Sequence, residues 1–213
     1  MKEKLQDQRV DYQKGTLNVN EVAENPLTQF QQWYEAYEAV EPKDPNAFVL
    51  ATVDSNGMPH SRVLLLKGID QGGFEFYTNY QSAKGQELAA NPKASMCFFW
   101  PELERQIRVE GEVQKLSAEE SIAYFKSRPH GSQVGAWVSP QSTVIESRQL
   151  LEDRLAEFSA KYQDDVPRPE HWGGYRLMPS RIEFWQGRSS RLHDRVLYIK
   201  AENSDWKIER LAP

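Results

Sequence analysis

Cysteine, histidine and long hydrophobic runs are all scarce in this chain. Its single cysteine, Cys97, cannot form an intrachain disulfide, which favours a reducing, cytoplasmic location; its apolar neighbours predict a buried small side chain rather than a nucleophile. The four histidines have no companions at metal-ligand spacing, so no metal site is expected. No apolar run approaches the length of a membrane span, and the N-terminus lacks the apolar region of a secretion signal.

Positive charge is not in excess either, and the glycine-rich loops of nucleotide-binding folds are missing. The 26 basic and 31 acidic residues give a formal net charge of −5, which argues against a nucleic-acid partner. No Gly-x-Gly-x-x-Gly or Walker-type loop occurs, so neither a Rossmann site nor a P-loop is indicated. Any anion site must therefore be built locally from clustered basic side chains, against the overall field of the protein.

Three segments carry helix signals. Asn25 and Pro26 predict a helix start, followed by apolar residues at three- and four-residue spacing. Ser117 and Glu120 form a capping box at the start of the second helix. The third is predicted over about residues 143–162, with its apolar side made by Val144, Leu151, Leu155 and Phe158.

Short alternating segments and tight turns dominate from residue 47 onward. The strands predicted from this pattern cover residues 47–53, 59–67, 74–78, 95–100, 106–115, 181–185, 192–200 and 206–211. Pro179 is expected to interrupt the strand region before residue 181, because proline cannot donate to a sheet ladder. The pattern predicts a single mainly β domain over residues 21–213, an antiparallel barrel with flanking helices. Residues 1–20 are polar and form a separate N-terminal segment, which is either mobile or folded over a substrate.

The segment Arg191-Leu192-His193-Asp194-Arg195 is the most distinctive charged motif. If it is extended, Arg191, His193 and Arg195 share one face, because side chains alternate along a strand. Two guanidiniums beside an imidazole favour an anionic or flat ligand. Asp194 and nearby acids could instead neutralise them as a solvated salt-bridge patch.

A second basic motif is Arg62-Val63-Leu64-Leu65-Leu66-Lys67. Its two cations are five residues apart, so a regular strand directs them to opposite faces. The apolar run between them predicts burial, and the cations then need counter-charges or access to solvent at both ends. Further on, a short helix predicted to open at Ser82 has Lys84 in its first turn, where free backbone N–H groups favour an anion.

Tyr124, Arg128 and Ser132 form a third candidate group. Tyr124 and Arg128 are four residues apart on the capped helix and so share a face, and Ser132 follows the break at Pro129. A phenol, a guanidinium and a hydroxyl fit a phosphate monoester, although an ordinary helix end explains the same residues.

Taken in order, these motifs resemble the pyridoxine/pyridoxamine 5'-phosphate oxidase family. The resemblance runs from about Arg9 to Pro213 and includes the blocks Glu104-Arg105-Gln106, Tyr124-Phe125-Lys126-Ser127-Arg128-Pro129, Trp172-Gly173-Gly174-Tyr175-Arg176 and Phe184-Trp185-Gln186-Gly187. It implies a homodimer of antiparallel Greek-key split β-barrels with FMN at the subunit interface. The implied reaction is oxidation of pyridoxine and pyridoxamine 5'-phosphates to pyridoxal 5'-phosphate, with O2 as acceptor and H2O2 as product.

The resemblance also implies roles for individual residues. The positions that match FMN contacts are Arg62, Val63, Leu64, Leu65, Leu66, Lys67, Tyr77, Thr78, Lys84, Gln106, Gln141, Ser142, Trp185 and Arg195. Those that match substrate contacts are Arg9, Tyr12, Lys67, Tyr124, Arg128, Ser132, Arg191 and His193. Arg191 and His193 match residues that face the reacting ring and are the expected catalytic pair; without this match, Trp185 is indistinguishable from a core residue.

Two departures from the family pattern stand out. The family usually has arginine where this chain has Ala83, and losing one charged hydrogen bond of about 1.5–3 kcal/mol predicts weaker retention of FMN. His130-Gly131 replaces a commoner arginine–acid pair, which leaves the conformation of that loop open. Two other functions compete: a split-barrel flavin reductase, against which Tyr124, Arg128 and Ser132 argue, and a non-catalytic flavin or pyridoxal phosphate binding protein, which only Ala83 favours.

Overall fold

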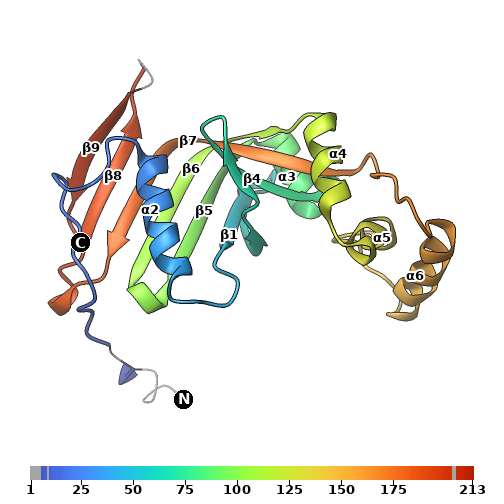
Figure 1. Ribbon diagram of the computed structural model, residues 1–213, viewed down its shortest axis with the longest axis horizontal. Helices are drawn as coiled ribbons and strands as arrows, with labels where there is room; N and C mark the ends of the chain where they lie inside the picture. The colour runs from blue at the N-terminus through green and yellow to red at the C-terminus, as the bar shows by residue number, and fades with distance from the viewer. Residues whose placement is uncertain (1–5, 9, 203–204) are drawn as a thin grey trace.

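The computed structural model describes residues 6–8, 10–202 and 205–213, and an antiparallel sheet of nine strands organises this part of the chain. The strand order is β2-β1-β5-β6-β7-β4-β3, with β8 beside β7 and β9 beside β8. The strands are β1 (Ala47–Val53), β2 (Pro59–Leu65), β3 (Gly68–Asp70), β4 (Gly73–Asn79), β5 (Lys93–Trp100), β6 (Arg105–Lys115), β7 (Trp172–Gln186), β8 (Asp194–Lys200) and β9 (Trp206–Leu211). The sheet curls into a half-open barrel (Figure 1), so the predicted antiparallel split barrel is confirmed.

Helix α2 (Pro26–Glu38) lies across the sheet and provides much of the core (Figure 1). Its predicted cap is confirmed, because the Asn25 side chain accepts from the Leu27 N–H. Phe30 is 1% exposed and packs edge-on against Phe74 and Phe98 at 5.0 Å, so α2 fills the barrel with aromatic rings.

The other helices are α3 (Ala83–Ala90), α4 (Ala118–Ser127), α5 (His130–Val138) and α6 (Gln149–Lys161). Both halves of the predicted capping box at Ser117 and Glu120 are present on α4. A second, smaller core lies under α4, α5 and α6 and is formed by Phe125, Val134, Val138, Val166 and Trp172. No helix in the described ranges is long and apolar enough to cross a membrane.

Strand β7 is the longest strand and joins the two ends of the molecule. Along one side it pairs with β6 over nearly its full length. Along the other side its first half, Trp172 to Leu177, pairs with β4, and its second half, Arg181 to Gln186, pairs with β8. The helices α4 to α6 therefore lie at one end of β7, and the hairpin β8–β9 lies at the other (Figure 1).

The prediction that Pro179 interrupts the strand is wrong. β7 continues through Pro179 because the ladder with β6 shifts register there, between Glu110 and Gly111. The register passes from Pro179 to Arg181, which leaves Ser180 as the extra residue of a bulge. Proline has no backbone N–H to donate to the ladder, and a bulge is a place where that missing bond is tolerated. The strand therefore bends instead of ending.

The predicted helix over about 143–162 is confirmed from Gln149 to Lys161 and wrong for residues 143–148. α6 begins at Gln149, and Val144 is 97% exposed in the irregular segment before it. A further helix, α5, occupies the region after Pro129 that the sequence left open. Gln133 stabilises the connection between α4 and α5, because its Nε2 donates to the carbonyls of Lys126 and Arg128 at 3.2 and 2.8 Å.

Residues 10–17, the N-terminal strap, lie against the end of the barrel. Glu104 is 7% exposed, and one of its carboxylate oxygens accepts from the backbone N–H groups of Gln13 and Lys14 at 2.8 and 2.9 Å. Asp194 accepts from the Leu17 N–H at 3.1 Å. Burial alone would raise the pKa of Asp194, but this bond and those from Arg188 and Arg210 hold it below its ordinary value.

Candidate functional site

A cavity of about 640 Å³ opens between β2, β4, α4 and α5. Ten of the residues predicted from the sequence to bind cofactor or substrate line it: Val63, Leu64, Leu65, Lys67, Tyr77, Thr78, Tyr124, Arg128, Ser132 and Gln141. Segments that are far apart in the sequence meet here because β4 pairs with β7, and α4 packs over the same half of β7.

The cationic wall of the cavity contains Lys67 and Arg128. The Arg128 guanidinium lies 4.6 Å from the ring centre of Trp172, and burial lowers its pKa from the ordinary value. Its NH1 atom is buried and has no hydrogen-bond partner in the part of the chain that the structure describes. Within the described residues no carboxylate forms an ion pair with Lys67 or Arg128. A buried N–H without a partner beside an open cavity is the arrangement that an anionic ligand completes.

Aromatic rings form the adjoining wall. Tyr77 and Tyr124 stack with their ring centres 3.8 Å apart, and Tyr77 lies 5.6 Å from Trp172. Burial, reinforced by the nearby Glu75, raises the pKa of Tyr77 to about 12, so its phenol remains a neutral hydrogen-bond donor. A β-carbon on Gly174 would lie 2.7 Å from the Tyr77 ring, so this position requires glycine for the ring to pack against β7.

Strand β2 departs from the prediction that its apolar run is largely buried. Val63 is 65% exposed and Leu65 is 38% exposed, because β2 is the edge strand of the sheet and this side of it faces the cavity. Leu66 is buried at 8% and points into the core, away from the cavity lining. β2 ends at Leu65, so Lys67 reaches the cavity from the connection to β3 and not from the opposite face of a regular strand.

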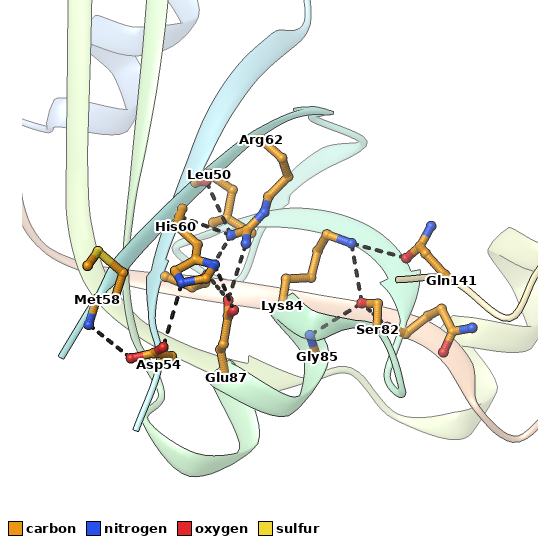
Figure 2. Close-up of polar contacts among 12 residues, drawn as sticks. Leu50, Asp54, Met58, His60, Arg62, Ser82, Lys84, Gly85, Glu87 and Gln141 are labelled. Carbon is orange, nitrogen blue, oxygen red and sulfur yellow. Dashed lines mark hydrogen bonds and ion pairs between the residues drawn. The ribbon is translucent and has the colours of Figure 1, made fainter. Parts of the chain in front are cut away.

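A group of charged side chains lies between β2 and α3, and we call Arg62, Lys84 and Glu87 the β2–α3 cluster (Figure 2). The predicted short helix is confirmed, with Ser82 as its cap accepting from the Gly85 N–H. Lys84 Nζ donates to Gln141 Oε1 at 3.0 Å, and Thr78 Oγ1 donates to the same oxygen at 3.3 Å. Because Thr78 and Gln141 line the cavity, the β2–α3 cluster is contiguous with it.

Lys84 and Arg62 differ in how their charge is compensated. Lys84 is 7% exposed, and among the described residues its hydrogen-bond acceptors are two neutral oxygens, those of Gln141 and Ser82. Burial and then repulsion from Arg62 lower its pKa. Arg62 instead pairs with the buried Glu87 carboxylate at 3.2 Å. The counter-charge that the sequence could not locate for Arg62 is therefore a residue of α3.

The condition that Arg191 to Arg195 runs extended is not met, and the strand predicted from residue 192 starts two residues later. Ser189–Arg191 forms a single 3-10 turn, Ser190 and Arg191 have φ of 58° and 61°, and β8 begins only at Asp194. Arg191, His193 and Arg195 therefore do not share a face through strand alternation. The salt-bridge alternative holds in part, since Arg195 donates to Glu183 at 2.8 Å, a bond that raises the Arg195 pKa.

A different geometry assembles what we call the C-terminal cluster: Gln106, Trp185, Arg191, His193 and Arg195. Gln106, Trp185 and Arg195 are register partners across β6, β7 and β8. The His193 ring lies 4.6 Å from that of Trp185. Its Nδ1 accepts from the Arg188 backbone N–H at 3.1 Å, which leaves Nε2 as the ring atom that carries hydrogen. Arg191 is exposed beside this group.

Tyr12, on the N-terminal strap, contacts the C-terminal cluster directly. Its ring lies 5.7 Å from Trp185 and 5.8 Å from His193, edge-on in both cases. Arg9, the other strap residue predicted to contact substrate, lies outside the described residues. Ser142 is exposed, with φ of 70°, and it follows Gln141 without lining the cavity.

The cavity and the C-terminal cluster lie at opposite ends of β7. Trp172 lines the cavity and Trp185 belongs to the C-terminal cluster, thirteen residues further along the strand. At about 3.3 Å per residue, this separates them by up to roughly 40 Å. The residues that the sequence assigned to a single site therefore form two groups that lie far apart within one chain.

Sequence reasoning missed several residues around the cavity. Trp172 supplies the ring under Arg128, and Glu87 neutralises Arg62. Trp172 was visible as part of a motif, but nothing local indicated that it would lie below a guanidinium. Glu87 carried no sequence signal, because an acid in the middle of a short helix is ordinarily exposed.

Comparison with known proteins gives two family matches and a set of similar sequences. Residues 35–162 match the family profile described as pyridoxamine 5'-phosphate oxidase, and residues 172–213 match one described as the pyridoxine 5'-phosphate oxidase C-terminal dimerisation region. The pyridoxine/pyridoxamine 5'-phosphate oxidase of Paraburkholderia phytofirmans is 58% identical over 212 residues, covering 98% of this chain and 99% of the relative.

Two solved structures are also similar. The crystal structure of PhzG from Burkholderia lata, in complex with tetrahydrophenazine-1-carboxylic acid, has a TM-score of 0.89 and 31% identity, covering 96% of this chain and 100% of the other. A pyridoxamine 5'-phosphate oxidase-related, FMN-binding protein from Nostoc punctiforme has a TM-score of 0.71 and 20% identity, covering 88% and 98%; this match supports the fold alone. The family resemblance inferred from the sequence motifs is thus confirmed.

Proposed function

Because the chain belongs to the pyridoxamine 5'-phosphate oxidase family, we propose that it oxidises pyridoxine and pyridoxamine 5'-phosphates to pyridoxal 5'-phosphate, with FMN as cofactor and O2 as electron acceptor. Pyridoxine phosphate and O2 give pyridoxal phosphate and H2O2. Pyridoxamine phosphate requires one water as well and releases ammonia. The observation that carries the proposal is the cavity in which Arg128 NH1 is buried without a partner, beside Lys67, Tyr124 and Ser132.

The residues present fit FMN and a phosphorylated substrate together. Two cationic positions border the cavity, one at Lys84 with Arg62 and one at Lys67 with Arg128. Lys84 bonds only neutral oxygens, and Arg128 has a free N–H, so each position can accept a phosphate. In the proposal the FMN phosphate binds at the first position and the 5'-phosphate of the substrate at the second.

Bound FMN supplies the two-electron redox chemistry, and the side chains supply binding and orientation. Lys67, Tyr124, Arg128 and Ser132 hold the substrate phosphate. The planar Arg191 guanidinium lies against the pyridine ring, and His193 Nε2 donates to a ring substituent. Tyr12 and the N-terminal strap exclude water from above.

A second copy of the chain completes the site in this proposal. One flavin cannot reach both the cavity and the C-terminal cluster of the same chain, because they lie at opposite ends of β7, up to roughly 40 Å apart. The match of residues 172–213 to a dimerisation region supports a homodimer, and this range contains Trp185, Arg191, His193 and Arg195. Each site is then built from the cavity of one protomer and the C-terminal cluster of its partner.

The activity is tested by mixing the purified protein with FMN and pyridoxamine 5'-phosphate in air. We expect pyridoxal phosphate and H2O2 to form in equal amounts, with a strict requirement for the substrate phosphate. Oxidation of a nicotinamide donor without turnover of the vitamer phosphate would support the flavin reductase instead. Binding of FMN and pyridoxal phosphate with no turnover would support the non-catalytic alternative.

A further inference from the structure

Glu87 is a buried carboxylate within the group of cations that surrounds the proposed FMN phosphate position. It is 8% exposed on α3, and Figure 2 shows His60 and Arg62 pointing toward it. Arg62 NH2 lies 3.2 Å from one oxygen and His60 Nδ1 lies 3.4 Å from the other. The Thr52 hydroxyl donates to the same oxygen that Arg62 contacts.

These contacts fix the position of the Arg62 guanidinium. Its NH1 donates to Thr52 Oγ1 and, at 3.2 Å, to the carbonyl of His60. Because Thr52 accepts from Arg62 and donates to Glu87, the three side chains form a closed ring of hydrogen bonds. Removing the carboxylate would leave Thr52 and Arg62 without this shared acceptor, and Arg62 would lose the contact that aligns its NH2 group.

Glu87 also changes the charge of this corner of the site. The charged and titratable groups facing it are Arg62 and His60 on β2, Lys84 on α3, and Asp54, whose carboxylate lies 3.7 Å from His60. The β2–α3 cluster of Arg62, Lys84 and Glu87 carries two positive charges and one negative charge. A phosphate monoester carries about −1.5 to −2 at neutral pH, so the carboxylate opposes the very group that the cations attract.

We propose that Glu87 is a positioning residue with two opposed effects: it holds Arg62 in place for the phosphate of FMN, and its charge limits how tightly that phosphate binds. The inference rests on the proposed FMN site. It adds that the net electrostatic attraction between this chain and the FMN phosphate is small. Glu87, which does not contact the flavin ring, sets its size.

The decisive variant is Glu87→Gln, which keeps an oxygen acceptor for Arg62 and removes the negative charge. We expect its Kd for FMN, measured by quenching of flavin fluorescence during titration of the apoprotein, to fall about tenfold. Glu87→Ala should raise the same Kd, because the Arg62 guanidinium loses the ion pair that holds it in position. Glu157→Gln, an exposed site on α6, is the matched control and should leave the Kd unchanged.

Riboflavin lacks the phosphate, so its Kd distinguishes an effect of the Glu87 charge on the phosphate from a general change in the fold. We expect its Kd to be the same for the wild type and Glu87→Gln, and thermal unfolding by circular dichroism checks the fold of each variant. An unchanged or weaker affinity of Glu87→Gln for FMN would overturn the inference. The titration requires no turnover, so a protein that binds FMN in this manner but makes no pyridoxal phosphate would refute the proposed function and leave the inference intact.

Discussion

Arg128 shows at the scale of one residue why the cavity requires an anion. A buried guanidinium with an unpartnered N–H costs free energy unless a ligand supplies the missing bond. The Trp172 ring beneath it and the Gln133 bonds around its backbone hold it toward the cavity before any ligand arrives.

We therefore expect Arg128→Ala to raise KM for pyridoxamine 5'-phosphate by about tenfold to a hundredfold, the loss of one charged hydrogen bond. The effect on kcat should be smaller, because the phosphate lies away from the reacting carbon. Steady-state kinetics with the FMN-loaded protein measures both. Lys126→Ala is the control: Lys126 is on α4, two residues before Arg128, which follows the helix end in an extended conformation, and it pairs with Asp165 outside the cavity. An equal rise in KM for both variants would contradict this role.

Ala83 offers a second prediction at this scale. Arginine at this position should tighten FMN binding, because it adds a donor to the first turn of α3. Residues 83 and 87 are four apart on this helix, so the new guanidinium can also pair with Glu87. Ala83→Arg should accordingly gain more affinity in the Glu87→Gln background than in the wild type. Fluorescence titration of the four proteins gives the coupling, and an FMN Kd that Ala83→Arg leaves unchanged in both backgrounds would place the phosphate elsewhere.

At the scale of elements, the N-terminal strap depends on a tight connection in the sheet. Glu104 has φ of 56° at the end of a short 3-10 turn between β5 and β6, and this directs its carboxylate to the backbone of the strap. Without these bonds, Tyr12 keeps its ring contacts to the C-terminal cluster and one hydrogen bond, from Ser189 Oγ to its carbonyl at 3.3 Å.

Glu104→Ala should release the strap and speed limited proteolysis within residues 10–17 by roughly tenfold or more, since two bonds to a carboxylate are lost. Mapping the cleavage sites by mass spectrometry provides the measurement. The neighbouring Glu102→Ala removes only the Tyr37 hydroxyl contact and serves as the control. If Glu104→Ala resists cleavage as the wild type does, the strap is held by other contacts.

At the scale of the whole molecule, the length of β7 supports the proposal that each site is shared between two chains. A strand that carries the cavity at one end and the C-terminal cluster at the other cannot fold back to join them. Two copies related by a two-fold axis can bring the cavity of each chain next to the C-terminal cluster of the other, which gives two equivalent sites.

Mixed dimers test this arrangement. At a substrate concentration near the wild-type KM, Arg128→Ala and Arg191→Ala homodimers should both turn over slowly, the first because its KM is raised; Arg191→Ala should keep nearly normal FMN binding. A heterodimer of the two, isolated with a different tag on each chain, should recover about half of the wild-type activity, because one of its two sites contains neither substitution. A heterodimer as inactive as both parents would show that each site belongs to a single chain.

The sequence alone determined the features that depend on near neighbours. The caps at Asn25 and Ser117, the hairpin turn before Pro59 and the alternating strands all follow from residues within one turn of each other. The family motifs likewise identified most of the residues that line the cavity, because they are short contiguous blocks.

Only the tertiary structure decided where those blocks meet. Val63 and Leu65 stay exposed because β2 is an edge strand, and Pro179 is tolerated because β7 forms a bulge at the next residue, Ser180. Arg62 finds its counter-charge on α3, twenty-five residues away in the chain, and Arg191 leaves the extended conformation at a 3-10 turn. These outcomes depend on strand pairing over long sequence separations, and a periodic pattern contains no information about which strand lies beside which.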